Sequence, residues 1–169
     1  MKFLLGGVAA VVAMALGCLV VVETGMFDAD ASAPHAAFTA WATHTSMIRS
    51  VQVRSRAVTA PVRFAQEQVR AGFHAYVMDC AMCHGGPAVP RQAWVQGMNP
   101  TPPYLLDAAR RWKAAQLYWI IKKGVKMTGM PAWGDLRSDA EIWNLVAFLE
   151  ALPDLSPDAY AQMKAADAR

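Results

Sequence analysis

The residues best suited to chemistry lie at positions 80–84, which read Cys-Ala-Met-Cys-His. Two thiols three positions apart, with an imidazole directly after the second, form the C-x-x-C-H signature at which a c-type haem is attached. The sulfur atoms of Cys80 and Cys83 would form thioether bonds to the porphyrin vinyl groups, whose spacing a helical segment matches. His84 would lie under the ring, where its Nε2 can bind the iron. We therefore expect one covalently bound haem c at this segment.

A C-x-x-C pair has three other uses, of which two explain the sequence less well and the third is a plain disulfide. A structural zinc site needs two further ligands, but the only other cysteine is Cys18 and the other histidines are not paired at ligand spacing. A thioredoxin-like redox pair requires a βαβ context, which the sequence does not indicate. A disulfide between Cys80 and Cys83 in a small exported domain is the simplest alternative.

A second candidate ligand lies in residues 126–134, which read KMTGMPAWG and contain two methionines. A thioether on a rigid loop suits the sixth position of haem iron, where Met/His ligation raises the reduction potential. We expect Met130 to be this ligand because a glycine precedes it and a proline follows it. Met127 is expected to pack against the protein instead.

The segment that delivers the chain to Cys80 is expected to be a helix over residues 62–80, because apolar residues recur there at intervals of three or four. Gly72 would let another helix approach closely, and Tyr76 would fill the contact one turn later. His74 is expected to face solvent and not to bind the haem.

Two further helices are expected after it. One covers residues 114–123 and ends at Gly124. The other begins after Ser138, where Ser-Asp-Ala-Glu forms a capping box, and Trp143 and Phe148 are expected to pack within it. A short polar helix at the C-terminus is expected to be peripheral.

Residues 85–103 are expected to be a loop across the haem edge, because their glycines and prolines interrupt helix and strand. A histidine ligand usually donates its other ring N–H to a carbonyl, which fixes its tautomer. We expect the carbonyl of Pro103 to accept this hydrogen bond from His84.

The N-terminal segment 3–22 has no charged residue, and a helix of that length spans about 30 Å, the thickness of a bilayer core. Lys2 before it and the acidic residues after it place the N-terminus in the cytoplasm and the rest of the chain outside. A retained single-pass anchor is expected. A cleaved signal peptide and a lipoprotein processed at Cys18 are the alternatives.

Between anchor and haem segment, a helix is expected over about 35–57, with Phe38 and Trp41 on one face. It would lie on the membrane surface, bind a partner subunit, or pack on the haem domain. The sequence thus predicts a transmembrane anchor at 1–22, a periplasmic connector at 23–60, a haem domain at 61–153 and a peripheral helix at 154–169.

With these motifs in place, the chain resembles a class I c-type cytochrome of the small, membrane-anchored, single-haem bacterial kind. The resemblance rests on residues 80–84, 128–133 and 142–149 and covers about 62–153. It implies an all-α fold with three to five helices around the haem, in which the helix of Gly72 and Tyr76 crosses the C-terminal one. It also implies that Cys80 and Cys83 attach the haem, with His84 as proximal and Met130 as distal iron ligand.

Two protein ligands leave no open position on the iron, so we expect an electron-transfer protein and not an enzyme, with no small-molecule substrate at the iron. Its partners would be redox proteins, as a subunit or dedicated partner of a respiratory-chain or dehydrogenase complex in the bacterial inner membrane. An enzyme or small-ligand sensor with a labile Met130 is the alternative. The net charge of +3 gives no argument for nucleic acid. Six basic residues and no acid lie within 110–126, where they would steer an acidic partner or merely be solvated.

Overall fold

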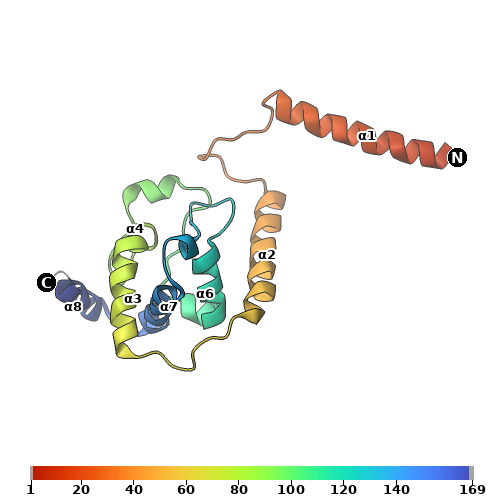
Figure 1. Ribbon diagram of the computed structural model, residues 1–169. Coiled ribbons are helices and arrows are strands. Elements are labelled where there is room, and N and C mark those ends of the chain that lie inside the picture. Colours follow the sequence, from red (N-terminus) through yellow and green to blue (C-terminus); the bar gives the residue numbers. More distant parts are fainter. Residues whose placement is uncertain (1, 168–169) are drawn as a thin grey trace. The chain divides into compact units, whose positions relative to one another are not determined.

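The computed structural model describes residues 2–167. The chain forms two compact units, and the boundary in the sequence lies between Pro34 and His35. The described residues are helical apart from loops and one isolated bridge between Gly86 and Val89, so the predicted all-α class is confirmed (Figure 1).

The first unit contains helix α1, Lys2–Glu23, followed by a loop. None of the α1 side chains is buried, and the helix is long and apolar enough to cross a membrane. A signal sequence near the N-terminus can meet the same criterion of length and composition.

The second unit carries the candidate site. Its elements, in chain order, are α2 (Ala37–Arg54), η1 (Ser55–Ala57), α3 (Gln66–Asp79), α4 (Ala81–His84), η2 (Ala93–Gly97), α5 (Ala108–Arg111), α6 (Ala114–Lys123), η3 (Trp133–Asp135), α7 (Asp139–Ala151), η4 (Leu152–Asp154) and α8 (Pro157–Asp167).

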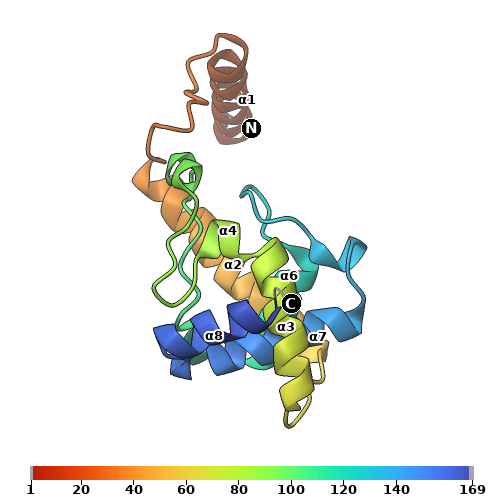
Figure 2. The same cartoon turned by 90° about the vertical axis from the view of Figure 1, so that its left-hand side faces the viewer.

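The core forms where α3 crosses α7, with α6 packed against α7 (Figure 2). The crossing is close because Gly72 has no side chain: a Cβ there would lie 1.8 Å from the carbonyl oxygen of Asn144. Aromatic rings fill the space beside it, and the centroid of Phe148 lies 5.4 Å from that of Phe73 and 4.9 Å from that of Tyr76. The predicted crossing of these helices is therefore confirmed.

Helix α6 matches its predicted bounds, and α7 begins where predicted, directly after Ser138. Gly124, at φ +65, ends α6, and the Ser138 hydroxyl accepts a hydrogen bond from the Glu141 N–H at the start of α7. Helix α3, in contrast, begins at Gln66 and not at Val62, which is 98% exposed. The chain is still extended at Ala65, whose N–H donates to the Gln68 side chain at 3.0 Å, and this contact starts the helix.

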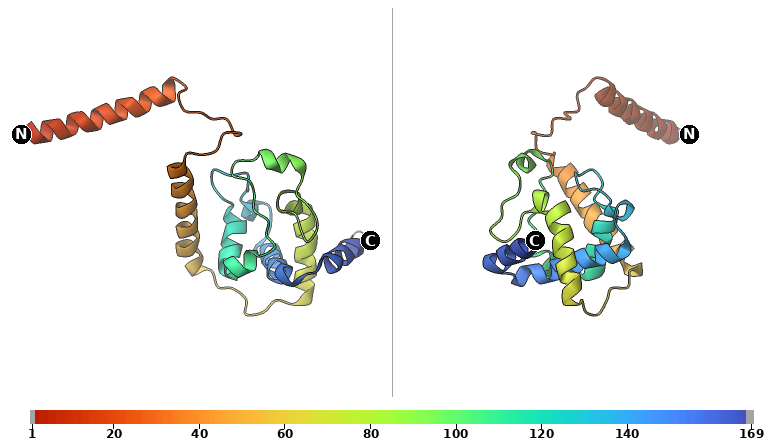
Figure 3. Two further views of the ribbon diagram at one scale, coloured as in Figure 1. Left: turned by 180° about the vertical axis from the view of Figure 1, so that it is seen from behind. Right: turned by 60° about the vertical axis from the view of Figure 1, so that its left-hand side comes forward.

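The C-terminal half of α2 packs on the rest of the second unit, where Val51 is buried and α2 runs beside α6 (Figure 3). Ser55, the first residue of η1, is buried as well. Its N-terminal half leaves Phe38 and Trp41 exposed. Of the roles predicted for this helix, packing on the haem domain is therefore confirmed for its second half.

Helix α8 is more than a surface element. Its Tyr160 is buried, with its ring centroid 5.3 Å from that of Phe73, and His74 Nδ1 lies 2.9 Å from a carboxylate oxygen of Asp167. The sequence predicted only a peripheral helix here, because one buried tyrosine among polar residues leaves no periodic signal. The ring of His74 is largely exposed, as predicted.

Candidate functional site

The Cys-x-x-Cys-His segment is one helical turn added to the end of α3. The Cys80 carbonyl accepts hydrogen bonds from the N–H groups of Cys83 and His84 at 3.0 and 2.9 Å. Residues three apart in such a turn share a face, so the two thiols lie on the same side of the segment. Both are partly buried and neither forms a disulfide, so the disulfide alternative is not supported.

Burial, with the negative charge of Asp79 next to it, raises the pKa of the Cys80 thiol to about 12. A redox-active Cys-x-x-Cys pair requires a thiol whose pKa is lowered, because the thiolate is the nucleophile. The environment of Cys80 is the opposite and favours a neutral, structural thiol over thioredoxin-like chemistry.

The His84 imidazole is held in one orientation. Its Nδ1 lies 2.7 Å from the Pro103 carbonyl oxygen, which can only accept, so Nδ1 donates and Nε2 carries the free lone pair. Burial lowers the pKa of His84, which favours the neutral ring that a metal requires. The predicted hydrogen bond to Pro103 is confirmed, and it presents Nε2 as a ligand.

Arg91 secures the loop that carries this acceptor. One of its terminal nitrogens donates to the Pro102 carbonyl, and its guanidinium carbon lies 4.3 Å from the centroid of the Tyr104 ring. Tyr104 in turn packs on Gly85, where a Cβ would lie 2.7 Å from the ring. Arg91 could not be predicted as a site residue, because an isolated arginine in a proline-rich loop belongs to no recognisable pattern.

The Arg91 Nε is buried, and the described part of the chain offers it no acceptor. A buried donor without a partner is costly, so this atom fits a site whose missing group carries acceptors. The haem has two carboxylate-bearing side chains that could satisfy it. Arg91 therefore supports the fit of a haem beside His84.

Met130 lies in the loop between α6 and α7, which we call the Met loop (residues 124–137). Its N–H donates to the Thr128 hydroxyl at 3.1 Å, and that hydroxyl donates to the Val125 carbonyl at 2.7 Å. Met130 is partly buried and packs on the core, whereas Met127 is 77% exposed at φ +62. The prediction that Met127 packs is wrong, because its side chain is exposed to solvent.

The two thiols, the neutral imidazole and the thioether form the donor set that a c-type haem uses. Within residues 2–167, no three His, Cys, Asp or Glu side chains gather as a metal cluster, so a zinc site finds no support. Met130 has the framed loop position that the sequence predicted for the distal ligand.

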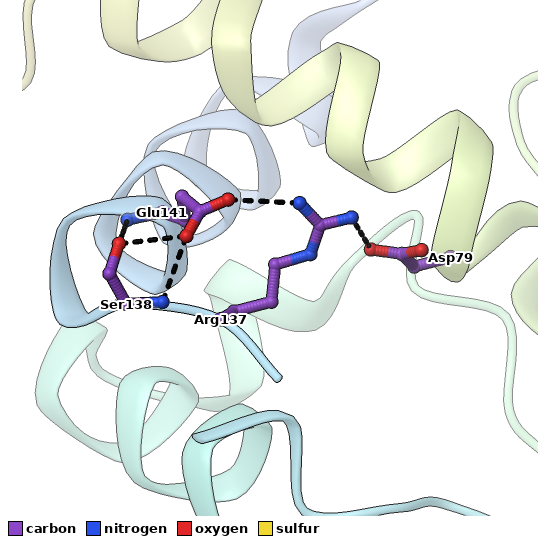
Figure 4. Close-up of polar contacts among 4 residues, drawn as sticks. All are labelled: Asp79, Arg137, Ser138 and Glu141. Atoms are coloured by element: carbon purple, nitrogen blue, oxygen red, sulfur yellow. Dashed lines mark hydrogen bonds and ion pairs between the residues drawn. The ribbon is translucent and has the colours of Figure 1, made fainter. Parts of the chain in front are cut away.

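An ion-pair network connects this site to the start of α7. Arg137, the last residue of the Met loop, bonds the carboxylates of Asp79 and Glu141, and Glu141 bonds Ser138 (Figure 4). Asp79 directly precedes Cys80. Only the capping box was predictable from the sequence, because Arg137 and Asp79 lie 58 residues apart.

A family model described as cytochrome c oxidase, cbb3-type, subunit III, matches residues 67–149. A comparison with curated proteins finds none that matches this chain. The matched residues include the Cys-x-x-Cys-His turn, the crossing of α3 and α7, and the Met loop. A cytochrome c domain of this type binds haem c and transfers electrons. With its helical fold and this donor set, the chain belongs to the class I c-type cytochromes.

Proposed function

We propose that this chain is a membrane-anchored periplasmic cytochrome with one covalent haem c, which passes single electrons between redox partners. The haem would be attached at Cys80 and Cys83 and held between His84 and Met130. It would act as a subunit or dedicated partner of a respiratory-chain or dehydrogenase complex.

The observation that carries the proposal is the hydrogen bond from His84 Nδ1 to the Pro103 carbonyl at 2.7 Å. It fixes the ring tautomer and makes Nε2 a stronger and better-oriented ligand before any metal binds.

When bound, the haem supplies an iron that cycles between Fe(III) and Fe(II). The residues of the chain would hold it in place: Cys80 and Cys83 would anchor the ring, and His84 and Met130 would bind the iron. Because two protein ligands would leave no position for a substrate, electron transfer through the haem edge is the chemistry that this donor set favours. The thioether at the sixth position also favours a higher reduction potential.

Exposed lysines at both ends of α6 support a protein partner of negative charge. Lys123 and Lys126 are exposed at the end of α6 and the start of the loop, as is Lys113 at the other end of α6. Lys122 differs, because its Nζ lies 2.5 Å from Asp139 and also bonds the Tyr118 hydroxyl. Exposed lysines would attract an acidic partner and orient it before docking.

Two further observations support a membrane complex. Helix α1 has the length and apolar composition of a membrane span. The family model that matches the chain is named for a subunit of a cbb3-type oxidase, an assembly of several subunits. Co-purification after extraction in a mild detergent would separate a subunit from a freely diffusing carrier.

Optical spectra of the oxidised and reduced protein test the proposal, compared among the native chain, Met130→Ala and the matched control Met127→Ala. We expect a low-spin native spectrum with a Met–Fe(III) charge-transfer band, which Met130→Ala loses and Met127→Ala keeps. The reduced Met130→Ala protein should also bind carbon monoxide. A native protein that is high-spin or binds carbon monoxide readily would refute the carrier and favour a ligand-binding or enzymatic role with a labile Met130.

A further inference from the structure

The guanidinium of Arg137 connects three parts of the second unit. One terminal nitrogen lies 2.6 Å from Asp79 Oδ2, and the other lies 3.0 Å from Glu141 Oε1 (Figure 4). Glu141 also accepts hydrogen bonds from the backbone N–H and the hydroxyl of Ser138, both at 2.8 Å. Arg137 therefore joins the end of α3, the end of the Met loop and the first turn of α7.

These contacts link the two segments that carry the proposed iron ligands. Asp79 is the last residue of α3 and lies five positions before His84. Arg137 is the last residue of the Met loop and lies seven positions after Met130. A change in the Asp79–Arg137 contact would thus alter the placement of one ligand segment relative to the other.

Other contacts hold the Met loop to itself and to α6. Within the loop, a Cβ on Gly124 would lie 2.6 Å from the Pro131 carbonyl oxygen. Between the loop and α6, a Cβ on Gly134 would lie 2.7 Å from the Lys122 side chain. The side chain of Met98, which belongs to the segment 85–103, contacts Gly129 and adds an apolar contact to the Met loop. None of these contacts reaches the turn of Cys80 and His84, whereas Arg137 reaches the residue directly before it.

The pair is better placed to stabilise a geometry than an ordinary surface ion pair. The side chains of Arg137 and Asp79 are 28% and 17% exposed, and the guanidinium bonds two carboxylates at once. In contrast, Arg110 and Asp154 lie 3.7 Å apart with side chains 67% and 87% exposed. Partly desolvated, charge-assisted hydrogen bonds are stronger than exposed pairs, many of which contribute nothing measurable.

We propose that Arg137 is a positioning residue that keeps the Met130 thioether at the haem iron by tying the Met loop to the end of α3. The inference rests on the proposed ligation by His84 and Met130. Without the tie, the loop would still be attached to α6, but it would open more often away from α3, and the sixth position would be vacant for a larger share of the time.

The test compares the haem-loaded native protein with Arg137→Gln, Arg137→Lys and the control Arg110→Gln, which removes an exposed pair. Two signals are followed in guanidinium chloride: the Met–Fe(III) band and the far-ultraviolet circular dichroism of the helices. Carbon monoxide binding to the reduced proteins reports the open state directly.

In Arg137→Gln we expect the band to be lost at a lower denaturant concentration than the helices, and the rate of carbon monoxide binding to rise about tenfold. Arg137→Lys should recover part of this loss, because an ammonium group can pair with Asp79 but cannot bond both carboxylates in the geometry of a guanidinium. Asp79→Asn combined with Arg137→Gln should add little to Arg137→Gln alone, since both remove the same contact.

The inference would be overturned if the band and the helices of Arg137→Gln were lost together, which would show a role in stability alone. It would also be overturned if Arg137→Gln behaved like Arg110→Gln. These results leave the proposed function intact, because the native band tests that separately. A native protein without the band would refute Met130 ligation and the role of Arg137 with it.

Discussion

Gly72 in α3 lies directly against the backbone of α7, and a Cβ at Gly72 would lie 1.8 Å from the Asn144 carbonyl oxygen and 2.5 Å from its carbonyl carbon. Backbone atoms cannot rotate away as a flexible side chain can. The substitution Gly72→Ala would therefore force the two helices apart. We expect it to destabilise the haem domain by about 3 kcal/mol or more, measured by denaturant unfolding.

A loss of stability in Gly72→Ala would indicate the close crossing itself, because alanine within a helix is intrinsically favoured over glycine by about 1 kcal/mol. Gly97→Ala serves as the matched control, since nothing lies within 4 Å of a Cβ built there and its φ is not left-handed. Its stability should change little. A Gly72→Ala protein as stable as the native one would show that α3 and α7 do not cross as closely as described.

The buried hydroxyl of Tyr76 donates to the carbonyl of Gly85 at 2.7 Å. This bond ties α3 to the first residue after His84. In Tyr76→Phe the Gly85 carbonyl would lose its partner in a buried site, so we expect a loss of roughly 1–3 kcal/mol in the free energy of unfolding. Tyr118→Phe removes a hydroxyl that bonds the partly exposed Lys122, and its loss should be smaller. Equal losses would argue against a special role for the Tyr76 bond.

Features set by short stretches of sequence were predictable. The turn of Cys80 and His84, the glycine end of α6 and the capping box at Ser138 each depend on a few adjacent residues with distinct chemistry. Pro103 as the acceptor for His84 also followed, because a proline-rich loop supplies a rigid carbonyl near the ring. Local chemistry was a sufficient guide at these positions.

Several features that depend on distant residues were not predictable. The side chains of Arg91 and Arg137 find their partners only once the loops are folded, and neither belongs to a periodic pattern. Tyr160 enters the core because α8 returns to α3, which no spacing within α8 indicates. Met127 was expected to pack because most methionines do, but its side chain is exposed. In each case tertiary packing decides the role of an otherwise ordinary residue.

The capping carboxylate of Glu141 makes the stability of this domain depend on acidity. Hydrogen bonds from the Ser138 backbone and hydroxyl, followed by the Arg137 side chain, lower the pKa of Glu141 from 4.5 to about 2. A carboxylate whose folded pKa lies below its unfolded value contributes fully above the unfolded pKa and loses that contribution as the pH falls. The contribution of Glu141 is therefore complete above about pH 4.5 and is lost as the pH approaches 2.

The variant Glu141→Gln should be less stable than the native protein at neutral pH, and the difference should shrink as the pH falls from 4.5 towards 2. Thermal unfolding at a series of pH values measures it. Glu150→Gln, at an exposed site at the end of the same helix, is the control and should run parallel to the native curve. A constant difference between Glu141→Gln and the native protein would contradict a lowered pKa.

Helix α1 offers a direct test of how the chain is held at the membrane. If the whole helix is the anchor, Cys18→Ser should leave the protein in the membrane fraction after a carbonate wash, because the apolar length is unchanged. Val12→Asp should release part of it, since a charged residue near the centre of a span costs roughly 3 kcal/mol in insertion. Intact mass spectrometry of the native protein should find no lipid on Cys18. Loss of the Cys18→Ser protein from the membrane, with a lipid-sized mass on the native chain, would instead show a lipoprotein processed at Cys18. A soluble native protein that lacks the residues of α1 would show a cleaved signal peptide.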